Sequence, residues 1–531
     1  MTSELTHSQV AVLRAQRIEV APARADWLPA AGVVVAVVVG AAVRLWGIGD
    51  VGFNSDEAVY AGQAAALSGN PEYTQFFAIF RAHPLLIQFL LSLVFQFGVS
   101  DIAARLLSVS IGLAAIPLIY LLGAQLFSRR VGVLSAVVLA VLPYHVVVTR
   151  QVLLDGPVMT LFLLSMFLLA RYMATQADRY LYLAAIAGGL TFLAKETAIL
   201  ILPVAGAFIL MTPTVRLGLR RLLIMLGAFA LAVSPYPISI AVSGASGTAK
   251  NFLIWQLLRR PNHGFTFYAE ILPGALGISL LLLAIIGVTI AVQRATWQDR
   301  LLLAWVLVPL AFYQFWPVKG YQYLLPIAPA LILLSARLLE LMPEAVAALR
   351  ARRPNLGARD DVVTRAGAGA LVLLLILPIA LSSFTHVGAQ GAVGSLAGTG
   401  GLPGGREAGA WIGQNVPEGA AFMTIGPTLS NLIQFYGHRR SQGLSVSPNP
   451  LDRNPAYDPI INPDNALRTL RIQYVGWDVW SASRSPFFER LLMKYVNKYH
   501  GRLVYEQIEN TQNVDRSTTR RAVIRIYEVR P

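Results

Sequence analysis

The sequence predicts an all-α polytopic membrane protein that ends in a small α/β domain. Three observations predict it. Charged residues make up only 13% of the 531-residue chain and hydrophobic residues 55%, whereas soluble domains carry about 25% charged residues. Apolar stretches of membrane-crossing length recur between residues 28 and 388, and a glycine-dense segment separates them from a more polar C-terminal part. Apart from these observations on the fold, the chain holds no cysteine, which excludes disulfides and thiolate metal sites.

The apolar stretches predict about eleven transmembrane helices, because a spanning helix needs roughly 17–25 mostly apolar residues. They lie near 28–48, 106–127, 131–149, 156–174, 180–194, 197–212, 222–243, 271–293, 301–316, 322–342 and 366–388. Residues 1–27 are polar, and no cleavage site clearly ends the first span, so we predict a cytoplasmic tail and an uncleaved first helix.

The stretch from Pro84 to Val99 is apolar but short. Gln88, Ser92 and Gln96 recur in it every four residues and form a polar stripe on one helical face. A helix of this kind is expected in the membrane interface rather than across the bilayer. We therefore predict interfacial helices within a long first outer loop, residues 49–105.

The positive charges give the orientation. With the segment 84–99 interfacial and the N-terminus inside, the Lys- and Arg-rich loops fall on the cytoplasmic side, as the positive-inside rule requires. These loops lie at 128–130, 171–179, 216–221, 294–300 and 350–365. The net charge of +15 therefore reflects membrane topology, and no nucleic-acid partner is expected. The predicted location is the cell (inner or plasma) membrane.

A second group of ionisable residues gathers on the predicted extracytoplasmic face. Charges at the ends of spans are costly unless they are hydrated or paired, so their convergence predicts a cavity there. The group comprises Asp56, Glu57, Arg81, His83, Arg105, Arg150, Asp155, Lys195, Glu196, Arg259, Arg260, His263 and Lys319.

The C-terminal part, placed outside by the odd number of spans, predicts a small extracytoplasmic α/β domain. A glycine-rich linker, 389–404, precedes a domain at 405–531. Helices are expected near 405–416, 428–437 and 485–499, and strands near 420–425, 472–478, 502–508 and 521–528. Its tryptophans, Trp411, Trp477 and Trp480, are candidate contacts for a glycan acceptor.

Two acidic sites carry the candidate chemistry. Asp56 is a candidate general base for an acceptor hydroxyl, although Ser55 and the pair Asp56-Glu57 also suit an ordinary helix start. Asp155 either pairs with Arg150, orients the acceptor, or joins Asp56 in holding a divalent cation, Mg or Mn. No cofactor is required by the sequence.

The basic residues of the outer face predict a phosphate site. Guanidinium and ammonium groups give strong charge-assisted hydrogen bonds to phosphate oxygens, whereas single cations at a membrane edge also snorkel toward water. The candidate phosphate ligands are Arg81, His83, Lys195, Arg259, Arg260 and Lys319.

The order of these features resembles the GT-C glycosyltransferases, in the branch of protein O-mannosyltransferases and the lipid A aminoarabinose transferase. The matching segments span residues 30–345: Asp56-Glu57, Arg81-Ala82-His83-Pro84-Leu85, Gly98 to Leu106, Thr149 to Gly156, Leu193-Ala194-Lys195-Glu196 and Lys319 to Pro326. Two positions depart from the pattern. His83 stands where the aminoarabinose branch tends to have lysine, and Leu85 replaces the second proline of the mannosyltransferase form.

The resemblance implies a transmembrane catalytic domain at 28–388 and a polyprenyl-phosphate-linked monosaccharide as donor. A hexosyl or pentosyl group would pass to an extracytoplasmic acceptor hydroxyl on a protein, lipid or cell-envelope glycan, with inversion. The expected catalytic residues are Asp56, Asp155 and Glu57, and the acceptor or sugar ligands Arg150, Glu196, His263 and Tyr321. The alternatives are a non-catalytic scaffold of envelope glycan synthesis and a secondary transporter; a transporter should show inverted repeats, and none is evident.

Overall fold

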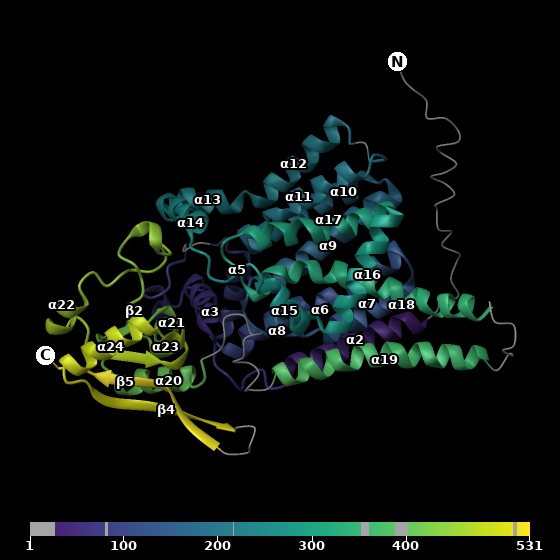
Figure 1. The fold of residues 1–531 in the computed structure, drawn as a ribbon. Coiled ribbons are helices and arrows are strands. Elements are labelled where there is room, and N and C mark those ends of the chain that lie inside the picture. The colour runs from purple at the N-terminus through teal and green to yellow at the C-terminus, as the bar shows by residue number, and fades with distance from the viewer. Residues whose placement is uncertain are drawn as a thin grey trace.

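The computed structural model describes residues 27–79, 83–215, 217–351, 360–387, 402–512 and 518–530. Helices from α2 to α19 form a bundle, and a small sheet with its own helices lies at one end of it, beside α3 (Figure 1). The long helix α19 runs along the edge of the bundle (Figure 1). Residues 1–26 of the predicted cytoplasmic tail, residues 389–401 of the predicted linker, and Arg81 lie outside the described residues.

The bundle consists of helices whose bounds follow the apolar stretches. They are α2 (Trp27–Leu45), α6 (Asp101–Leu126), α7 (Arg129–Val141), α8 (Pro143–Thr149), α9 (Asp155–Thr175), α10 (Asp178–Ala194), α11 (Ile201–Met211), α12 (Leu219–Val233), α13 (Pro235–Ser243), α14 (Ser246–Leu258), α15 (Phe267–Leu276), α16 (Ile278–Arg294), α17 (Trp297–Phe315), α18 (Ala328–Ala351) and α19 (Asp360–Val387). The 3₁₀ turns η2 (Glu196–Leu200) and η3 (Tyr321–Ile327) precede α11 and α18.

Within the described residues, four helical segments are long and apolar enough to cross a membrane, or up to seven if each bent pair counts as one span. These are the marks of a multi-pass membrane protein. Every predicted span coincides with helix where the chain is described, but the count of about eleven spans is not confirmed, because helices such as α10 and α11 are shorter or less apolar than the criterion requires.

The three bent helix pairs show why the length of a single helix is a poor guide to the number of spans. α7 and α8 meet at 56°, α12 and α13 at 41°, and α15 and α16 at 110°. Pro143 and Pro235 begin the second helix of the first two pairs; proline lacks the N–H that would continue the helix. Gly277 joins the third pair with a φ of 80°, a conformation that glycine adopts without strain.

A buried arginine closes the break between α7 and α8. Arg44 of α2 is fully buried and donates from Nη1 to the carbonyls of Gly40 and Ala140, both at 2.8 Å. Its Nε donates to Thr149 Oγ1 at 3.0 Å, and Nη2 contacts His145 Nδ1 at 2.7 Å. The last carbonyls of a helix have no intrahelical donor, and within a bilayer no water can replace it. Arg44 supplies that donor for α7.

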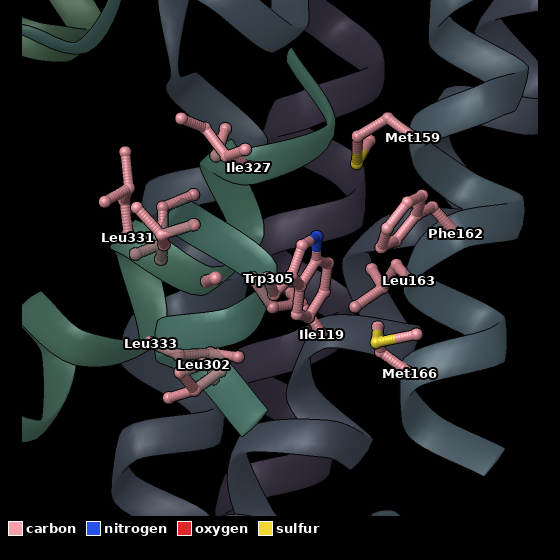
Figure 2. Close-up of a cluster of buried hydrophobic side chains, with 14 of the residues drawn as sticks. Ile119, Met159, Phe162, Leu163, Met166, Leu302, Trp305, Ile327, Leu331 and Leu333 are labelled. Carbon is pink, nitrogen blue, oxygen red and sulfur yellow. The ribbon is translucent and has the colours of Figure 1, made fainter. Parts of the chain in front are cut away.

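The core of the bundle centres on Trp305 of α17. Its ring stacks on Phe162 of α9, with centroids 5.6 Å apart and planes 17° from parallel, among aliphatic side chains of the neighbouring helices (Figure 2). The indole Nε1 donates to the carbonyl of Pro326 at 2.8 Å. Buried indole N–H groups need such a partner, so Trp305 also fixes η3 against α17.

The segment 49–105, for which we keep the name first outer loop after its predicted position, carries α3 (Ser55–Leu67), α4 (Pro71–Thr74), α5 (Leu86–Val94) and η1 (Phe95–Phe97). The polar stripe of α5 faces the protein: Gln88 and Ser92 are buried, and Gln88 donates to Gln63 of α3. Phe89 and Leu93, each one position further round the helix, are 53% and 49% exposed. The helix therefore presents its apolar face outward and its polar face to α3.

The sheet has the strand order β2-β1-β3-β5-β4. β1 (Ala421–Thr424) pairs in parallel with β2 (Arg440–Gly443) and β3 (Tyr474–Asp478), and β5 (Thr518–Glu528) pairs antiparallel with β3 and β4 (Arg502–Gln512). The helices are α20 (Gly405–Asn415), α21 (Pro427–Gly437), α22 (Pro463–Arg468), α23 (Val479–Arg484) and α24 (Pro486–Lys498). The sequence pattern misses β2, because Arg-Ser-Gln-Gly shows no apolar alternation.

The C-terminal part shares a hydrophobic core with the first outer loop. Phe53 and Ala61 lie in one buried cluster with Leu432 and Phe435 of α21. Phe53 is fully buried, and its ring centroid is 5.1 Å from that of Phe435. The segment from 405 onward is therefore packed directly on the loop that carries Asp56, although the domain boundary at the linker stays a prediction.

We expect Trp305→Ala to lower the free energy of unfolding by about 3–5 kcal/mol, because it leaves a cavity and removes the support of η3. Thermal unfolding of the protein in detergent measures this. Leu307→Ala, on the same helix but 46% exposed, is the matched control. Equal losses in the two variants would contradict the central role of Trp305.

Candidate active site

The segment before α3 is held by a capping box. The Asn54 side chain accepts from the backbone N–H groups of Asp56 and Glu57, both at 2.9 Å, and Glu57 Oε2 accepts from the Asn54 N–H at 3.0 Å. Asn54, rather than the expected Ser55, is thus the N-cap. This arrangement fixes the directions in which the two neighbouring carboxylates leave the helix.

The Glu57 carboxylate is bound into the scaffold. It is 1% exposed and accepts from Arg105 Nε at 2.9 Å and Nη2 at 2.7 Å, and from the Val152 N–H at 3.0 Å. Arg105 also donates to the carbonyls of Ile48, Val51 and Gly52. With its oxygens occupied in this way, Glu57 ties α3 to α6 and to the loop after α8.

The Asp56 carboxylate has a different environment. It is half-buried, and among the described residues no hydrogen bond to it is found. Burial raises the pKa of Asp56 above its ordinary value; the Lys195 ammonium group and the neighbouring His83 oppose this rise, and the Asp155 carboxylate adds to it. A carboxylate with a raised pKa and free oxygens is suited to accept a proton.

Asp155 and Lys195 form a buried ion pair. Asp155 begins α9, and Lys195 follows α10 in an extended conformation. Lys195 Nζ donates to both carboxylate oxygens, at 2.9 and 3.0 Å, and lies 4.6 Å from the centre of the Tyr323 ring. Burial lowers the pKa of Lys195, but Asp155 together with Tyr323 and Tyr313 more than offsets this, and the pKa is raised.

The sequence-based alternative that paired Asp155 with Arg150 is therefore wrong. The Arg150 guanidinium instead donates to the backbone carbonyls of Trp46, at 2.7 Å, and Val387, at 2.9 Å. It belongs to the scaffold that holds the start of the first outer loop. Within the described residues it makes no contact that would mark it as a sugar ligand.

His83 and Glu196 form a second pair beside Asp56. His83 Nδ1 lies 2.6 Å from Glu196 Oε2, and its ring meets Tyr60 and Phe252 edge-on, at centroid distances of 6.0 and 5.5 Å. Glu196 Oε1 is buried without a hydrogen-bond partner among the described residues. An unpaired buried oxygen is costly, so this atom is available to a ligand hydroxyl.

The remaining predicted cations come from the segment 259–263 and from Lys319, and we call this edge of the Asp56 cluster the rim. Arg259 stacks on Trp255, with its Cζ 4.4 Å from the ring centre, and burial lowers its pKa, with Tyr323 and Asp56 opposing. Lys319 is buried and its Nζ contacts the Trp316 carbonyl at 3.3 Å. Arg260 and His263 are exposed, and His263 stacks on Phe267 at 4.1 Å.

The structure therefore divides the predicted residues into groups. Asp56, His83, Asp155, Lys195, Glu196 and Arg259 interact with one another or with a shared neighbour. Glu57 and Arg150 lie in the scaffold behind them, where a cavity adjoins Glu57, Arg105 and Arg150 but not Asp56. Arg260 and His263 lie on the exposed rim. Arg81 lies outside the described residues.

Tyrosines that the sequence reasoning missed face this cluster. Tyr321, the predicted ligand, is buried against Tyr144, whose hydroxyl donates to the Tyr321 carbonyl. Tyr323, two residues later, lies under Lys195 instead. Tyr60 stands one helical turn after Asp56 and beside His83; its i+4 spacing from Asp56 was the signal that could have identified it.

The two carboxylates proposed as cation ligands do not fit a divalent metal. Lys195 occupies both oxygens of Asp155, so its ammonium group stands where the cation would bind. Within the described parts of the chain, no group of three or more acidic, histidine or cysteine side chains has metal-binding geometry. We derive no step through a metal ion.

Comparison with known proteins confirms the resemblance. Residues 82–238 match the family model of dolichyl-phosphate-mannose-protein mannosyltransferases. No curated protein is significantly similar in sequence. Among solved structures, apo ArnT from Cupriavidus metallidurans superposes with a TM-score of 0.66 at 16% identity, covering 93% of this chain and 97% of that one. The same protein bound to undecaprenyl phosphate gives 0.65 at 16% identity over 95% and 98%.

A second neighbour is the archaeal oligosaccharyltransferase AglB from Archaeoglobus fulgidus, in complex with an inhibitory peptide and a dolichol-phosphate. It has a TM-score of 0.55 at 14% identity and covers 93% of this chain and 74% of that one. The chain thus has the fold of the GT-C glycosyltransferases.

The two adjacent acids are predicted to differ in how much protein stability depends on their charge: Glu57 is tested by removing its partner Arg105, and Asp56 by removing its own charge. Arg105→Met should lower the free energy of unfolding by about 3–5 kcal/mol, because it leaves the Glu57 carboxylate buried without its cation. Asp56→Asn should leave unfolding nearly unchanged. Thermal unfolding in detergent distinguishes them, and a large loss from Asp56→Asn would contradict the assignment of Glu57 to the scaffold and Asp56 to the site.

Proposed function

We propose that the protein transfers a monosaccharide from a polyprenyl-phosphate donor to an acceptor hydroxyl on the extracytoplasmic face of the membrane. The family match and the fold support a glycosyltransferase. The observation that carries the proposal is the contrast between the adjacent acids: Glu57 is fully paired, whereas Asp56 is unpaired within the described residues and faces cations.

In the proposed reaction Asp56 acts as the general base. The acceptor oxygen attacks C1 of the sugar while its proton passes to the Asp56 carboxylate, and the bond between C1 and the phosphate oxygen breaks. The electron pair of that bond leaves with the polyprenyl phosphate. A single displacement of this kind inverts C1 and needs no second, nucleophilic carboxylate.

Cations at the rim would stabilise the departing phosphate. Arg259 and Lys319 are the leading candidates, because neither has a carboxylate partner among the described residues, and fixed cations near a leaving group lower the barrier. Lys195 is already paired with Asp155, so we assign it to holding the local charge and to setting the pKa of Asp56. Arg81, which the sequence predicts as a phosphate ligand, is proposed to act with Arg259 and Lys319.

The surfaces beside the site suit a lipid tail. Phe89 and Leu93 of α5 point outward, and Leu253 and Leu257 of α14 are 56% and 66% exposed. Exposed apolar side chains gathered on one face of a helix in a membrane protein suit contact with lipid. A donor lying in the outer half of the bilayer would then present its phosphate to the rim. Glu196 Oε1 is the proposed contact for a sugar or acceptor hydroxyl.

Transfer of radiolabel tests the function. The protein in nanodiscs is incubated with a panel of polyprenyl-phosphate sugars and membrane extract. Wild type should transfer label from one donor, and Asp56→Asn should lower the rate about 10²–10⁴-fold by removing the base. Glu418→Gln removes an exposed carboxylate far along the chain and should leave the rate unchanged.

Near-full turnover by a correctly inserted Asp56→Asn variant would remove Asp56 as the base. Binding of a donor without any transfer would favour the scaffold alternative. Failure to bind any member of the panel would overturn the proposed donor class.

The rate should depend on pH through Asp56. Because the pKa of Asp56 is raised, kcat/KM should fall on the acidic side at a pH above that of an ordinary carboxyl. His83 lowers the pKa of Asp56, so His83→Gln should move this acidic limb to higher pH. Initial rates across pH in the two proteins measure the shift. A limb that stays in place or moves to lower pH would contradict the electrostatic coupling.

A further inference from the structure

We propose that the C-terminal α/β part positions the catalytic base, and that Tyr436 and Asn431 of α21 are the positioning residues. The inference rests on the proposed function, because it concerns the same Asp56. It assigns to this part of the chain a role in catalysis rather than in capture of the acceptor alone.

The Tyr436 hydroxyl joins the two sides. It accepts from the Phe53 N–H at 2.8 Å and donates to Asp101 Oδ2 at 2.5 Å. Phe53 lies three residues before Asp56, and Asp101 begins α6, which also carries Arg105. One side-chain hydroxyl thus connects α21 to the backbone that enters α3 and to the helix that anchors Glu57.

Asn431 makes the second connection. It is 1% exposed, and its Nδ2 donates to Ser55 Oγ at 2.9 Å and to Tyr457 Oη at 3.2 Å. Ser55 is the residue immediately before Asp56. Tyr457 belongs to the loop between β2 and α22, and η6 (Pro450–Asp452) in that loop packs against α14 at the rim. The amide therefore bridges the segment that carries Asp56 to the loop that packs against α14.

Arg406 of α20 supports the same backbone. It pairs with Asp101 at 2.7 Å and donates to the carbonyls of Gly49, at 2.9 Å, and Val51, at 3.3 Å. A Cβ added at Gly52 would lie 2.9 Å from Arg406 Cβ, so the backbone at Gly52 and the start of α20 are in close contact. Residues 49–55 are therefore hydrogen-bonded by side chains of both α20 and α21 on the face that packs against the C-terminal part.

The consequence is geometric. Buried hydrogen bonds to a backbone segment hold it in one conformation, and loss of about 1 Å in placement of a reacting group can cost on the order of 10²-fold in rate. The helix start that aims Asp56 is set on one side by Arg105 and Glu57, and on the other by Tyr436 and Asn431. Weakening the second side should disturb the reaction step without removing a group that contacts substrate.

Tyr436→Phe tests this, because it removes the hydroxyl and keeps the ring in the shared core. In the transfer assay with the donor that wild type uses, we expect kcat to fall about tenfold or more, with KM for the donor within about twofold. The Phe53 amide should also exchange its hydrogen faster, measured by mass spectrometry on the whole protein in nanodiscs. Asn431→Leu should lower kcat in the same direction.

Tyr499→Phe is the matched control. It removes a tyrosine hydroxyl that bonds Asp464 in the same C-terminal part but touches nothing in the first outer loop, so kcat and exchange near Phe53 should not change. A merely structural role for Tyr436 would lower the unfolding temperature and leave kcat unchanged.

The outcomes separate the inference from the function. Faster exchange with unchanged kcat, or unchanged exchange at Phe53, would overturn the positioning role while Asp56→Asn still abolished transfer. If wild type transferred no sugar, or if Asp56→Asn kept full activity, the proposed function would fail and the inference with it. Loss of kcat with faster exchange only in the α21 variants supports it.

Discussion

The buried ion pair between Glu57 and Arg105 is the interaction on which the rest of the site depends. Its members are 48 residues apart, and both are nearly excluded from solvent. Burying either charge alone costs several kcal/mol, whereas the pair with its added backbone bonds is tolerated. Arg105 also donates hydrogen bonds to three backbone carbonyls in residues 48–52. The pair therefore fixes the backbone that leads into α3, and with it the direction in which Asp56 points.

The charges around Asp56 follow a consistent pattern. Asp155 is paired with Lys195, and Glu196 Oε2 lies within hydrogen-bond distance of His83 Nδ1, as buried charges require partners. Of the three acids in this cluster, Asp56 has no such bonded partner among the described residues, so its pKa depends on its burial and on the charges of its neighbours. Arg105, Arg150 and Arg406, from three distant parts of the chain, donate to backbone carbonyls of residues 46–49, between α2 and α3. Scaffold and reactive groups are thus interleaved in sequence but separated in space.

Sequence could predict the convergence but not the pairing. The predicted spans and the loop between the first two of them place Asp56, Asp155 and Lys195 on one face, and the three side chains do lie close together. Which cation bonds Asp155 depends on side-chain direction at helix ends, and Arg150 points to Trp46 instead. Tyr321 and Tyr323 are two residues apart in a 3₁₀ turn, whose register a pattern cannot assign. Bends at Pro143 and Gly277 shorten helices below spanning length. The contact of α21 with residues 53–55 is a tertiary interaction without local signal.

The central claim is a single displacement at C1 assisted by one base. Its most direct test is the anomeric configuration of the product, read by NMR from the coupling of the sugar's anomeric proton and compared with that of the donor. The account predicts inversion. Retention would contradict it, because retention requires a second displacement and a nucleophile that the proposed role of Asp56 does not supply.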